Sequence, residues 1–170
     1  MQRTSHLWLL GLSGSGKSTV GPLLAQRLSM PFIDTDQRIT QTAQRSIPEI
    51  FSQGGEKEFR KLESLAVAEL SKSPPSVISC GAGAILDPAN RHTLSRTGLR
   101  IYLQAELSSL VERLSDSTNR PLLPTDQLHP RLTAQFAERK RWYEESEIII
   151  STGCDSPEQI CQKIISALPS

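Results

Sequence analysis

Residues 11–18 read Gly-Leu-Ser-Gly-Ser-Gly-Lys-Ser, which matches the phosphate-binding pattern G-x-x-x-x-G-K-[ST] at every fixed position. An apolar run at residues 6–10 precedes the motif and a helical pattern follows it, so the motif joins a predicted strand to a predicted helix. Glycines let backbone N–H groups surround phosphate oxygens, and the helix directs the positive end of its dipole at them. A glycine-rich turn with a chance lysine accounts less well for this context. The motif predicts a nucleoside triphosphate site.

Two side chains of the motif suit particular parts of such a ligand. Lys17 can reach the β- and γ-phosphates, and the Ser18 hydroxyl is placed to ligate the Mg²⁺ that accompanies them. The predicted nucleotide-binding residues of this stretch are Gly14, Ser15, Gly16, Lys17, Ser18 and Thr19.

Short apolar runs alternate with segments of helical periodicity along the chain. Strands are predicted at residues 6–10, 31–33, 76–79, 99–103 and 147–151. Helices are predicted at residues 17–29, 48–70, 107–114, 132–145 and 157–168. Such alternation implies parallel strands with right-handed crossovers, so the predicted fold is an α/β three-layer sandwich around a five-stranded parallel sheet. Pro22 is expected only in or near the first turn of its helix.

Composition narrows the class of protein. With 22% charged residues, a net charge of +1 and 5% aromatic residues, the chain is neither a disordered polyelectrolyte nor a nucleic-acid binder. Positive charge is nonetheless uneven, because residues 91–141 hold nine Lys and Arg against five Asp and Glu. A proposed function should explain this local surplus.

The cysteines and the apolar runs bear on where the protein resides. Cys80, Cys154 and Cys161 are odd in number and form no C-x-x-C pair, so we expect reduced thiols rather than a disulfide framework or a zinc site. The apolar run at residues 7–10 is too short for a signal peptide or a membrane span. We therefore expect a cytoplasmic protein without a membrane partner.

A second group of polar residues follows the second predicted strand, which ends in Asp34-Thr35-Asp36. Open α/β sheets bind ligands at the carboxyl edge of their strands, where these residues would lie. Alternation along an extended segment predicts that both aspartates point to the same side, one for magnesium and one for an acceptor hydroxyl. The alternative is that Asp36 caps a short helix, which would explain one aspartate but not the pair.

Further motifs follow in a distinctive order. They are Ser-Ile-Pro-Glu-Ile-Phe at residues 46–51, Gly55-Glu56, Phe59-Arg60-Lys61-Leu62-Glu63, Ser-Cys-Gly-Ala-Gly-Ala at residues 79–84, Arg120-Pro121-Leu122-Leu123, and Arg139 with Tyr143 four residues on. With the phosphate loop and the segment Phe32–Asp36, they make the chain resemble the shikimate kinase family from Gly11 to Glu145.

The resemblance implies the architecture and the reaction. It implies a P-loop kinase fold related to the nucleoside-monophosphate kinases, formed by residues 1–170 as one domain. A helical segment at about residues 36–72 would bind the acceptor, and a mobile loop at about 115–130 would act as a lid. The family transfers the γ-phosphoryl group of ATP, with Mg²⁺, to the 3-hydroxyl of shikimate, a step towards chorismate and the aromatic amino acids. We expect ATP and shikimate as partners, and a monomer.

The same resemblance implies a role for each matching residue. Asp34 would hold Mg²⁺ through water beside Ser18, and Asp36 would bind the acceptor hydroxyl and receive its proton. Arg60 and Arg139 would hold the shikimate carboxylate, for which a guanidinium fork is well suited. The third-strand loop, Gly81, Ala82 and Gly83, would offer backbone N–H groups to shikimate. Arg113 would flank the adenine, Arg120 would contact the ATP phosphates, and the catalytic set would be Lys17, Asp36 and Arg120.

Each arginine also has a plainer interpretation. Arg60 lies within reach of Glu56 and Glu63 on one helix face, and Arg113 of Glu112 or Asp116, so either could form surface ion pairs. Arg139 belongs to a charged run, Glu-Arg-Lys-Arg at residues 138–141, that is typical of a solvated helix face.

The sequence departs from the family pattern at two places. Ala82 replaces the middle glycine of three, which would cost roughly 1–2 kcal/mol if its φ were positive and little if φ were negative. Arg141-Trp142 stands where the family commonly has Pro-Leu, which would let the helix run on and alter how Arg139 is presented. Two other functions stay open: a P-loop kinase for another small hydroxy acid such as gluconate, and a nucleotide-binding regulator without transfer activity.

Overall fold

The structure, a computed structural model, describes residues 5–115 and 125–169. In these ranges five parallel strands form one sheet in the order β2-β3-β1-β4-β5, which confirms the predicted α/β three-layer class. The strands are β1 (His6–Leu10), β2 (Phe32–Asp34), β3 (Val77–Ser79), β4 (Gly98–Gln104) and β5 (Ile148–Ser151). The helices are α1 (Lys17–Leu28), α2 (Thr35–Ala43), α3 (Ile47–Leu70), the 3₁₀ turn η1 (Ala84–Leu86), α4 (Pro88–Thr97), α5 (Leu107–Ser115), α6 (Thr125–Tyr143) and α7 (Pro157–Ala167).

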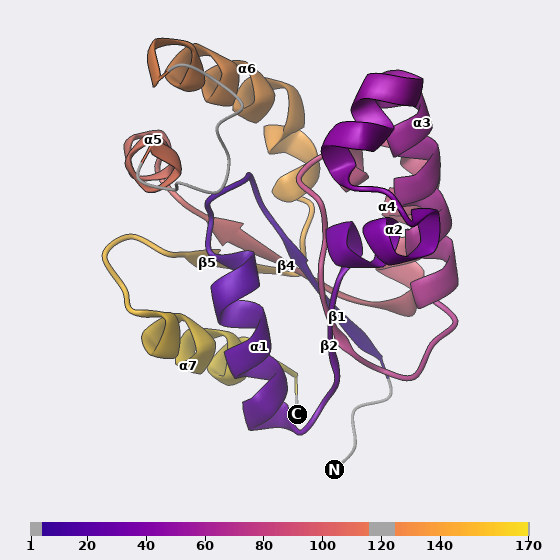
Figure 1. The fold of residues 1–170 in the computed structure, drawn as a ribbon. Coiled ribbons are helices and arrows are strands. Elements are labelled where there is room, and N and C mark those ends of the chain that lie inside the picture. The colour runs from indigo at the N-terminus through magenta and orange to yellow at the C-terminus, as the bar shows by residue number, and fades with distance from the viewer. Residues whose placement is uncertain (1–4, 116–124, 170) are drawn as a thin grey trace.

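Alternate side chains of the buried strands supply two cores, one on each face of the sheet. On β1, Leu7 and Leu9 pack with α1 and α7, whereas Trp8 and Leu10 pack with α3, α4, α5 and α6. Figure 1 shows these two groups of helices on opposite sides of the sheet. Among the described residues, no helix is both long and apolar enough to cross a membrane.

Periodicity predicted neither α2 nor α4, although a short helix near Asp36 was considered as an alternative and the family resemblance implied a helical segment at about residues 36–72. α2 begins directly after β2, capped by Asp34, and buries only Thr35 and Ile39. α4 begins after its cap Asp87 with Pro88 at the first position and buries only Asn90 and Leu94. Neither helix therefore presents the apolar stripe from which a helix is recognised, and caps rather than periodicity define both.

The region predicted as a mobile loop, residues 115–130, is helical where it is described. α5 ends at Ser115 and α6 begins at Thr125, seven residues before the predicted start, with Pro130 inside it. Residues 116–124, with Arg120 among them, lie outside the described residues. Pro22 is also deeper in its helix than predicted, at the sixth position of α1. Its ring removes only the hydrogen bond to the carbonyl of Ser18, an exposed residue.

The start of β4 offers a test of the packing between the two central strands. Gly98 pairs with His6, and a Cβ at Gly98 would lie 2.2 Å from the His6 carbonyl oxygen. Because backbone rather than a flexible side chain occupies that space, we expect Gly98→Ala to lower the free energy of unfolding by about 1–3 kcal/mol, measured in urea. Leu65→Ala, at a side chain 57% exposed, is the matched control and should change it by less than about 0.5 kcal/mol. Equal stability of the two variants would contradict this account.

Candidate active site

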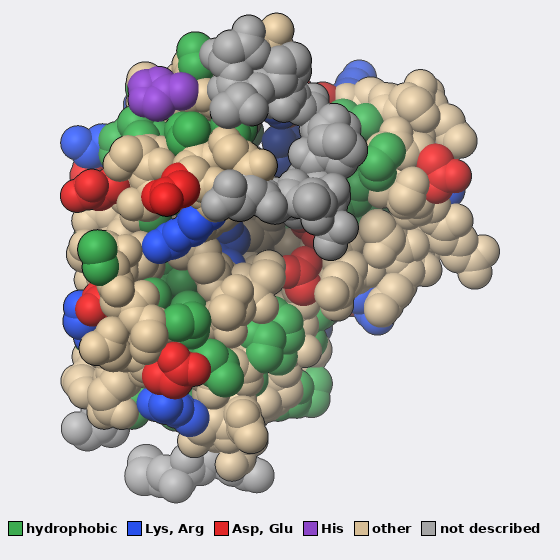
Figure 2. All heavy atoms as spheres, turned by 60° about the vertical axis from the view of Figure 1, so that its left-hand side comes forward, with side chains coloured by type: hydrophobic (Ala, Val, Ile, Leu, Met, Phe, Trp, Pro, Cys, Tyr) green, Lys and Arg blue, Asp and Glu red, His purple; other side chains and the backbone are tan. Residues whose placement is uncertain are grey.

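The loops that follow β1, β2 and β3 meet at one edge of the sheet and line a cavity of about 690 Å³. That volume is in the range of sites for small organic ligands. Charged side chains of both signs surround the hollow in the middle of this face (Figure 2). The predicted site residues that line the cavity are Gly14, Ser15, Gly16, Lys17, Ser18, Thr19, Asp34, Asp36, Gly81, Ala82 and Arg113.

The phosphate loop has a backbone that only glycine adopts readily at its two ends. Gly11 has φ 146°, and a Cβ there would lie 2.6 Å from the Ser15 Oγ and 2.8 Å from the Leu103 carbonyl oxygen. Gly16, with φ 99°, is the N-cap of α1 and has no side chain to cover the first turn. The first amides of α1 therefore face the cavity, the arrangement that binds phosphate.

Lys17 is held inside this loop. Its Nζ donates to the carbonyl oxygens of Gly11 at 2.7 Å and Leu12 at 3.0 Å, and the residue is only 9% exposed. The ammonium group is therefore held by carbonyl oxygens of the phosphate loop, beside the position where a phosphate would meet it.

Asp34 and Asp36 reach the cavity by a different geometry from the one predicted. Asp34, not Asp36, is the helix cap: its Oδ1 accepts from the backbone N–H of Asp36 at 2.9 Å and of Gln37 at 3.3 Å. The chain turns into α2 at Thr35, so the prediction of an extended segment with alternating side chains was wrong. Both carboxylates line the cavity nonetheless, because the first helical turn also turns Asp36 towards it.

Gly81 lies where two carboxylates converge. Its backbone N–H donates to the Thr35 hydroxyl at 2.9 Å, which ties the loop after β3 to the start of α2. A Cβ at Gly81 would lie 2.5 Å from the Glu63 Oε1 and 3.0 Å from the Asp36 Oδ1. Glycine is therefore required here by the close approach of these oxygens.

Arg60 is held against the same loop by two glutamates. Its Nη1 donates to Glu63 at 2.7 Å and its Nη2 to Glu56 at 3.2 Å, so the ion pairs considered from the sequence do form. They are not equivalent, because the side chain of Glu63 is 1% exposed and that of Glu56 is 66% exposed. A Cβ at Gly83 would lie 2.1 Å from the Arg60 Nη1, so the guanidinium rests directly on the loop.

Burial raises the pKa of the Glu63 carboxyl above its ordinary value, although the Arg60 guanidinium beside it acts in the opposite direction. Its Oε1 is buried and accepts no hydrogen bond within the described residues. A buried carboxylate oxygen with spare hydrogen-bonding capacity is well suited to receive a hydroxyl donor.

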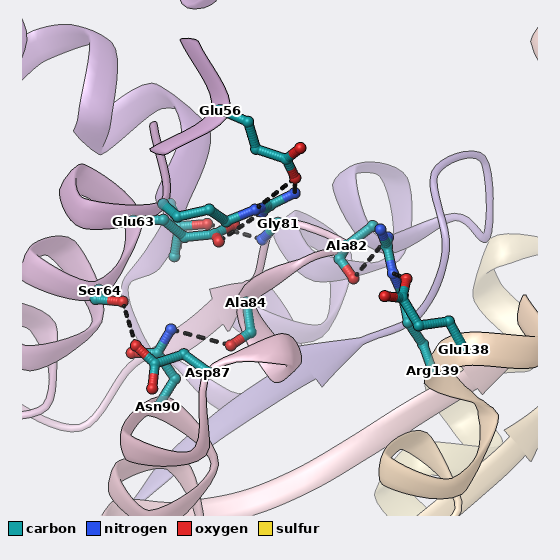
Figure 3. A network of polar contacts seen from close by, with 12 residues as sticks. Glu56, Glu63, Ser64, Gly81, Ala82, Ala84, Asp87, Asn90, Glu138 and Arg139 are labelled. Atoms are coloured by element: carbon teal, nitrogen blue, oxygen red, sulfur yellow. Dashed lines mark hydrogen bonds and ion pairs between the residues drawn. The ribbon is translucent and has the colours of Figure 1, made fainter. Parts of the chain in front are cut away.

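Arg139 approaches the loop from the other side, from α6. The residue is 6% exposed rather than solvated, and its Nη1 donates to the Ala82 carbonyl oxygen at 3.2 Å. The Tyr143 hydroxyl, one helical turn further on, donates to the same oxygen at 2.7 Å. Figure 3 shows Arg139 at Ala82 and Glu63 beside Gly81, with the loop between them. The two guanidiniums predicted to hold an acidic acceptor thus flank one loop.

The departure at Ala82 costs no backbone strain. Among the described residues that are not glycine, only Ser29 and Gln44 have positive φ, so Ala82 keeps an ordinary conformation. The second departure has the predicted effect on the helix, because α6 continues through Arg141 to Tyr143.

Of the two remaining predicted arginines, Arg113 lies within the described residues and Arg120 does not. Arg113 extends from α5 to the cavity, where it donates to the carbonyl oxygens of Gly14 at 3.3 Å and Gly153 at 3.4 Å. These bonds differ from the predicted alternative, a surface pair with Glu112 or Asp116, of which Asp116 lies outside the described residues. Arg120 lies outside the described residues, so its predicted role stays a prediction. Gly83, the last residue of the loop, and the two arginines that flank the loop, Arg60 and Arg139, are not part of the cavity lining.

The residues present suit a divalent ion that arrives with a nucleotide. Within the described part of the chain, no three His, Cys, Asp or Glu side chains are grouped to hold a metal. Ser18 and Asp34 line the cavity, and one carboxylate oxygen of Asp34 accepts the hydrogen bonds that cap α2. Two such oxygen groups cannot complete an octahedral shell alone, which is typical of Mg²⁺ sites completed by phosphates and water.

Three site residues had no role assigned from the sequence. Glu63 and Tyr143 lie three and four positions after Arg60 and Arg139, spacings that place each on the same helix face as its arginine. That spacing was the available signal. Thr35 gave none, because its contact with Gly81 depends on β2 lying beside β3.

A phosphate loop and a second group of carboxylates and guanidiniums, at one edge of a parallel sheet, define a P-loop kinase of a small molecule. The shikimate kinase family profile matches residues 13–169. With nearly the whole chain matched, the protein belongs to the shikimate kinase family.

Individual relatives agree with this assignment. A shikimate kinase of Microcystis aeruginosa is 42% identical over 169 residues, which are 99% of this chain and 88% of that protein. The structure of a shikimate kinase from Acinetobacter baumannii in complex with shikimate superimposes with a TM-score of 0.91 at 31% identity, covering 97% of this chain and 93% of that one. A gluconokinase from Sinorhizobium meliloti, at 17% identity and a TM-score of 0.65 over 98% and 93% of the two chains, shares the fold alone.

The cysteines give a chemical test of this site. Cys80, at the cavity after β3, and Cys161 are buried, and burial raises the pKa of both thiols, whereas Cys154 is exposed. We expect a chromogenic disulfide reagent at pH 8 to titrate about one thiol per native chain and all three after denaturation. In Cys154→Ser the fast-reacting thiol should disappear. Rapid reaction of a second thiol in the native protein would contradict this account, and its loss in Cys80→Ser would show that the cavity wall at Cys80 opens.

Proposed function

We propose that this chain transfers the γ-phosphoryl group of ATP to the 3-hydroxyl of shikimate. The observation that carries the proposal is the loop at Gly81–Gly83, which has Arg60 on one side, Arg139 on the other and the Asp36 carboxylate at its start. Two guanidiniums match one carboxylate of an acceptor, and a separate carboxylate matches a hydroxyl. A small acid that also carries hydroxyl groups satisfies both.

On the nucleotide side, the chain supplies positive groups and backbone donors. Lys17 and the first amides of α1 would meet the β- and γ-phosphates, and Arg113 lies at the cavity wall formed by Gly14 and Gly153. Arg120, if it approaches as the family resemblance implies, would add another positive charge. Such charges stabilise the charge that spreads over the phosphoryl oxygens during transfer.

On the acceptor side, Asp36 would orient the 3-hydroxyl and receive its proton. Glu63 is buried and would keep Arg60 in place, whereas Glu56 is exposed, so its ion pair is weak and the acceptor carboxylate can take its position. Arg139 would bind the same carboxylate from the opposite side. Binding energy from a group remote from the reacting hydroxyl would then set the position of that hydroxyl.

Magnesium would be held by the Ser18 hydroxyl directly and by Asp34 through water, with the nucleotide phosphates completing its shell. When bound, the ion would neutralise phosphate charge during transfer. Asp34 can serve it while still capping α2, because only its Oδ1 accepts the two backbone N–H groups.

Two alternatives are less favoured. A gluconate kinase could share the cavity, but the similarity in sequence is to shikimate kinases and extends over nearly the whole chain. A regulator without transfer activity would gain support from strain at Ala82, and Ala82 has none. A coupled ADP-release assay with shikimate, gluconate or no acceptor tests the proposal. We expect turnover with shikimate only; turnover with gluconate, or turnover that needs no acceptor, would overturn it.

Arg139→Ala should weaken binding of the acceptor and leave binding of the nucleotide unchanged. Removing the guanidinium removes a charged hydrogen bond to the acceptor, so the KM for shikimate should rise about 10-fold to 100-fold, with the KM for ATP changed little. The measurement is steady-state kinetics with each substrate varied in turn. Lys140→Ala is the control, because Lys140 is the next residue and its 3.7 Å pair with Glu144 is exposed. An unchanged shikimate KM in Arg139→Ala would contradict the assignment.

Asp36→Asn should lower kcat while leaving nucleotide binding intact. The amide keeps the shape of the side chain but can no longer take the hydroxyl proton, so we expect a loss of about 10²–10⁴-fold in kcat. Calorimetry with a non-hydrolysable ATP analogue supplies the control for an undamaged phosphate loop. Near-normal turnover of Asp36→Asn would refute the role of Asp36 as base.

A further inference from the structure

The last turn of α6 makes a contact that the reaction described above does not use. Trp142 is half-buried, and the guanidinium of Arg91, from α4, lies 4.5 Å from the centre of its ring. The guanidinium of Arg141 lies over the same ring at 4.3 Å. Trp142 is part of the departure from the family pattern, and Arg91 belongs to the positively charged stretch for which the sequence suggests no role.

Arg91 joins this ring to the backbone after the loop Gly81–Gly83, which is called the acceptor loop below. Its Nη1 donates to the carbonyl oxygens of Ile85 at 2.6 Å and Leu86 at 3.1 Å, both in η1. A guanidinium can bind carbonyl oxygens with its edge while its flat face rests on an aromatic ring. One side chain therefore connects α4, η1 and the end of α6.

The segment from Ala82 to Leu86 is thus attached to α6 at both ends. At its start, Arg139 and Tyr143 donate to the Ala82 carbonyl oxygen at 3.2 and 2.7 Å. At its end, Arg91 donates to η1 and stacks on the ring of Trp142. Because Trp142 directly precedes Tyr143 on the helix, displacement of its ring displaces the turn that presents Arg139 and Tyr143.

We propose that Arg91 and Trp142 are positioning residues that hold the end of α6 in register with the acceptor loop, so that Arg139 meets the acceptor carboxylate. The role rests on the proposed function, because the carboxylate in question is that of shikimate. It also gives a purpose to the uninterrupted α6 helix. Without a proline to end the helix, the stacked Arg91–Trp142 pair sets where its last turn lies.

Packing alone is the competing explanation, because Trp142 also contacts the core cluster around Leu94 and Tyr143. Three variants separate the two. Trp142→Phe keeps an apolar ring, and Arg91→Lys keeps the charge but cannot stack and bond two carbonyl oxygens at once. Arg141→Ala removes the other guanidinium over the ring, and within the described residues Arg141 donates no hydrogen bond to η1.

The first experiment is steady-state kinetics with shikimate and ATP varied separately. We expect Arg91→Ala and Trp142→Ala to raise the KM for shikimate about fivefold to twentyfold, with the KM for ATP and kcat within about threefold of wild type. Trp142→Phe should recover much of the loss, Arg91→Lys little of it, and Arg141→Ala should stay within about twofold of wild type. Thermal unfolding of each variant shows whether it is folded under the assay conditions.

A second readout does not depend on turnover. The chain has two tryptophans, and Trp8 is fully buried, so acrylamide quenching of fluorescence reports chiefly on Trp142. Shikimate should reduce this quenching in wild type and in Arg141→Ala, but much less in Arg91→Ala, with Trp142→Phe as the blank.

The outcomes are distinguishable. An unchanged shikimate KM in folded Arg91→Lys and Trp142→Ala would overturn the positioning role while leaving the proposed function intact, as would a rise in both KM values together. Wild-type protein that does not phosphorylate shikimate would overturn the proposed function and the positioning role with it.

Discussion

β3 lies between β1 and β2 in the sheet, and parallel pairing on both sides brings the loops after all three strands to one edge. This constraint determines the rest of the site. The first loop curls round phosphate positions, the second turns into α2 at Asp34, and the third, at Gly81–Gly83, separates the two. In the proposed reaction, nucleotide and acceptor would approach the same point from opposite sides, which in-line transfer requires.

Glycine and alanine in the third loop let helices approach from both sides. A Cβ at Gly81 or Gly83 would meet Glu63 or Arg60 from α3, while the Ala82 carbonyl oxygen receives Arg139 and Tyr143 from α6. The Nη1 of the buried Arg139 donates to a backbone oxygen that exists whatever residue occupies position 82. This explains why alanine there removes no donor or acceptor and adds no strain.

Local features of the site were predictable from the sequence, and those that depend on tertiary neighbours were not. The phosphate loop is a contiguous motif, so its place between β1 and α1 followed directly. The burial of Arg139 could not be predicted, because the charged run around it is typical of a solvated helix face. In the structure the end of α6 packs on the acceptor loop and buries this side chain. α4 escaped detection because its caps, rather than an apolar stripe, define it. The local surplus of positive charge is likewise only partly for ligands, since Arg91 binds η1 and Arg100 pairs with Glu147.

Recognition of the acceptor carboxylate by Arg139 can be tested with a substrate that is altered at that carboxylate. The measurement compares kcat/KM for shikimate and for its methyl ester in wild type and in Arg139→Ala. The wild type should prefer shikimate by about 10-fold or more, since the ester lacks the charge, and Arg139→Ala should lose most of that preference. An equal preference in both proteins would show that Arg139 does not contact the carboxylate and would contradict the account.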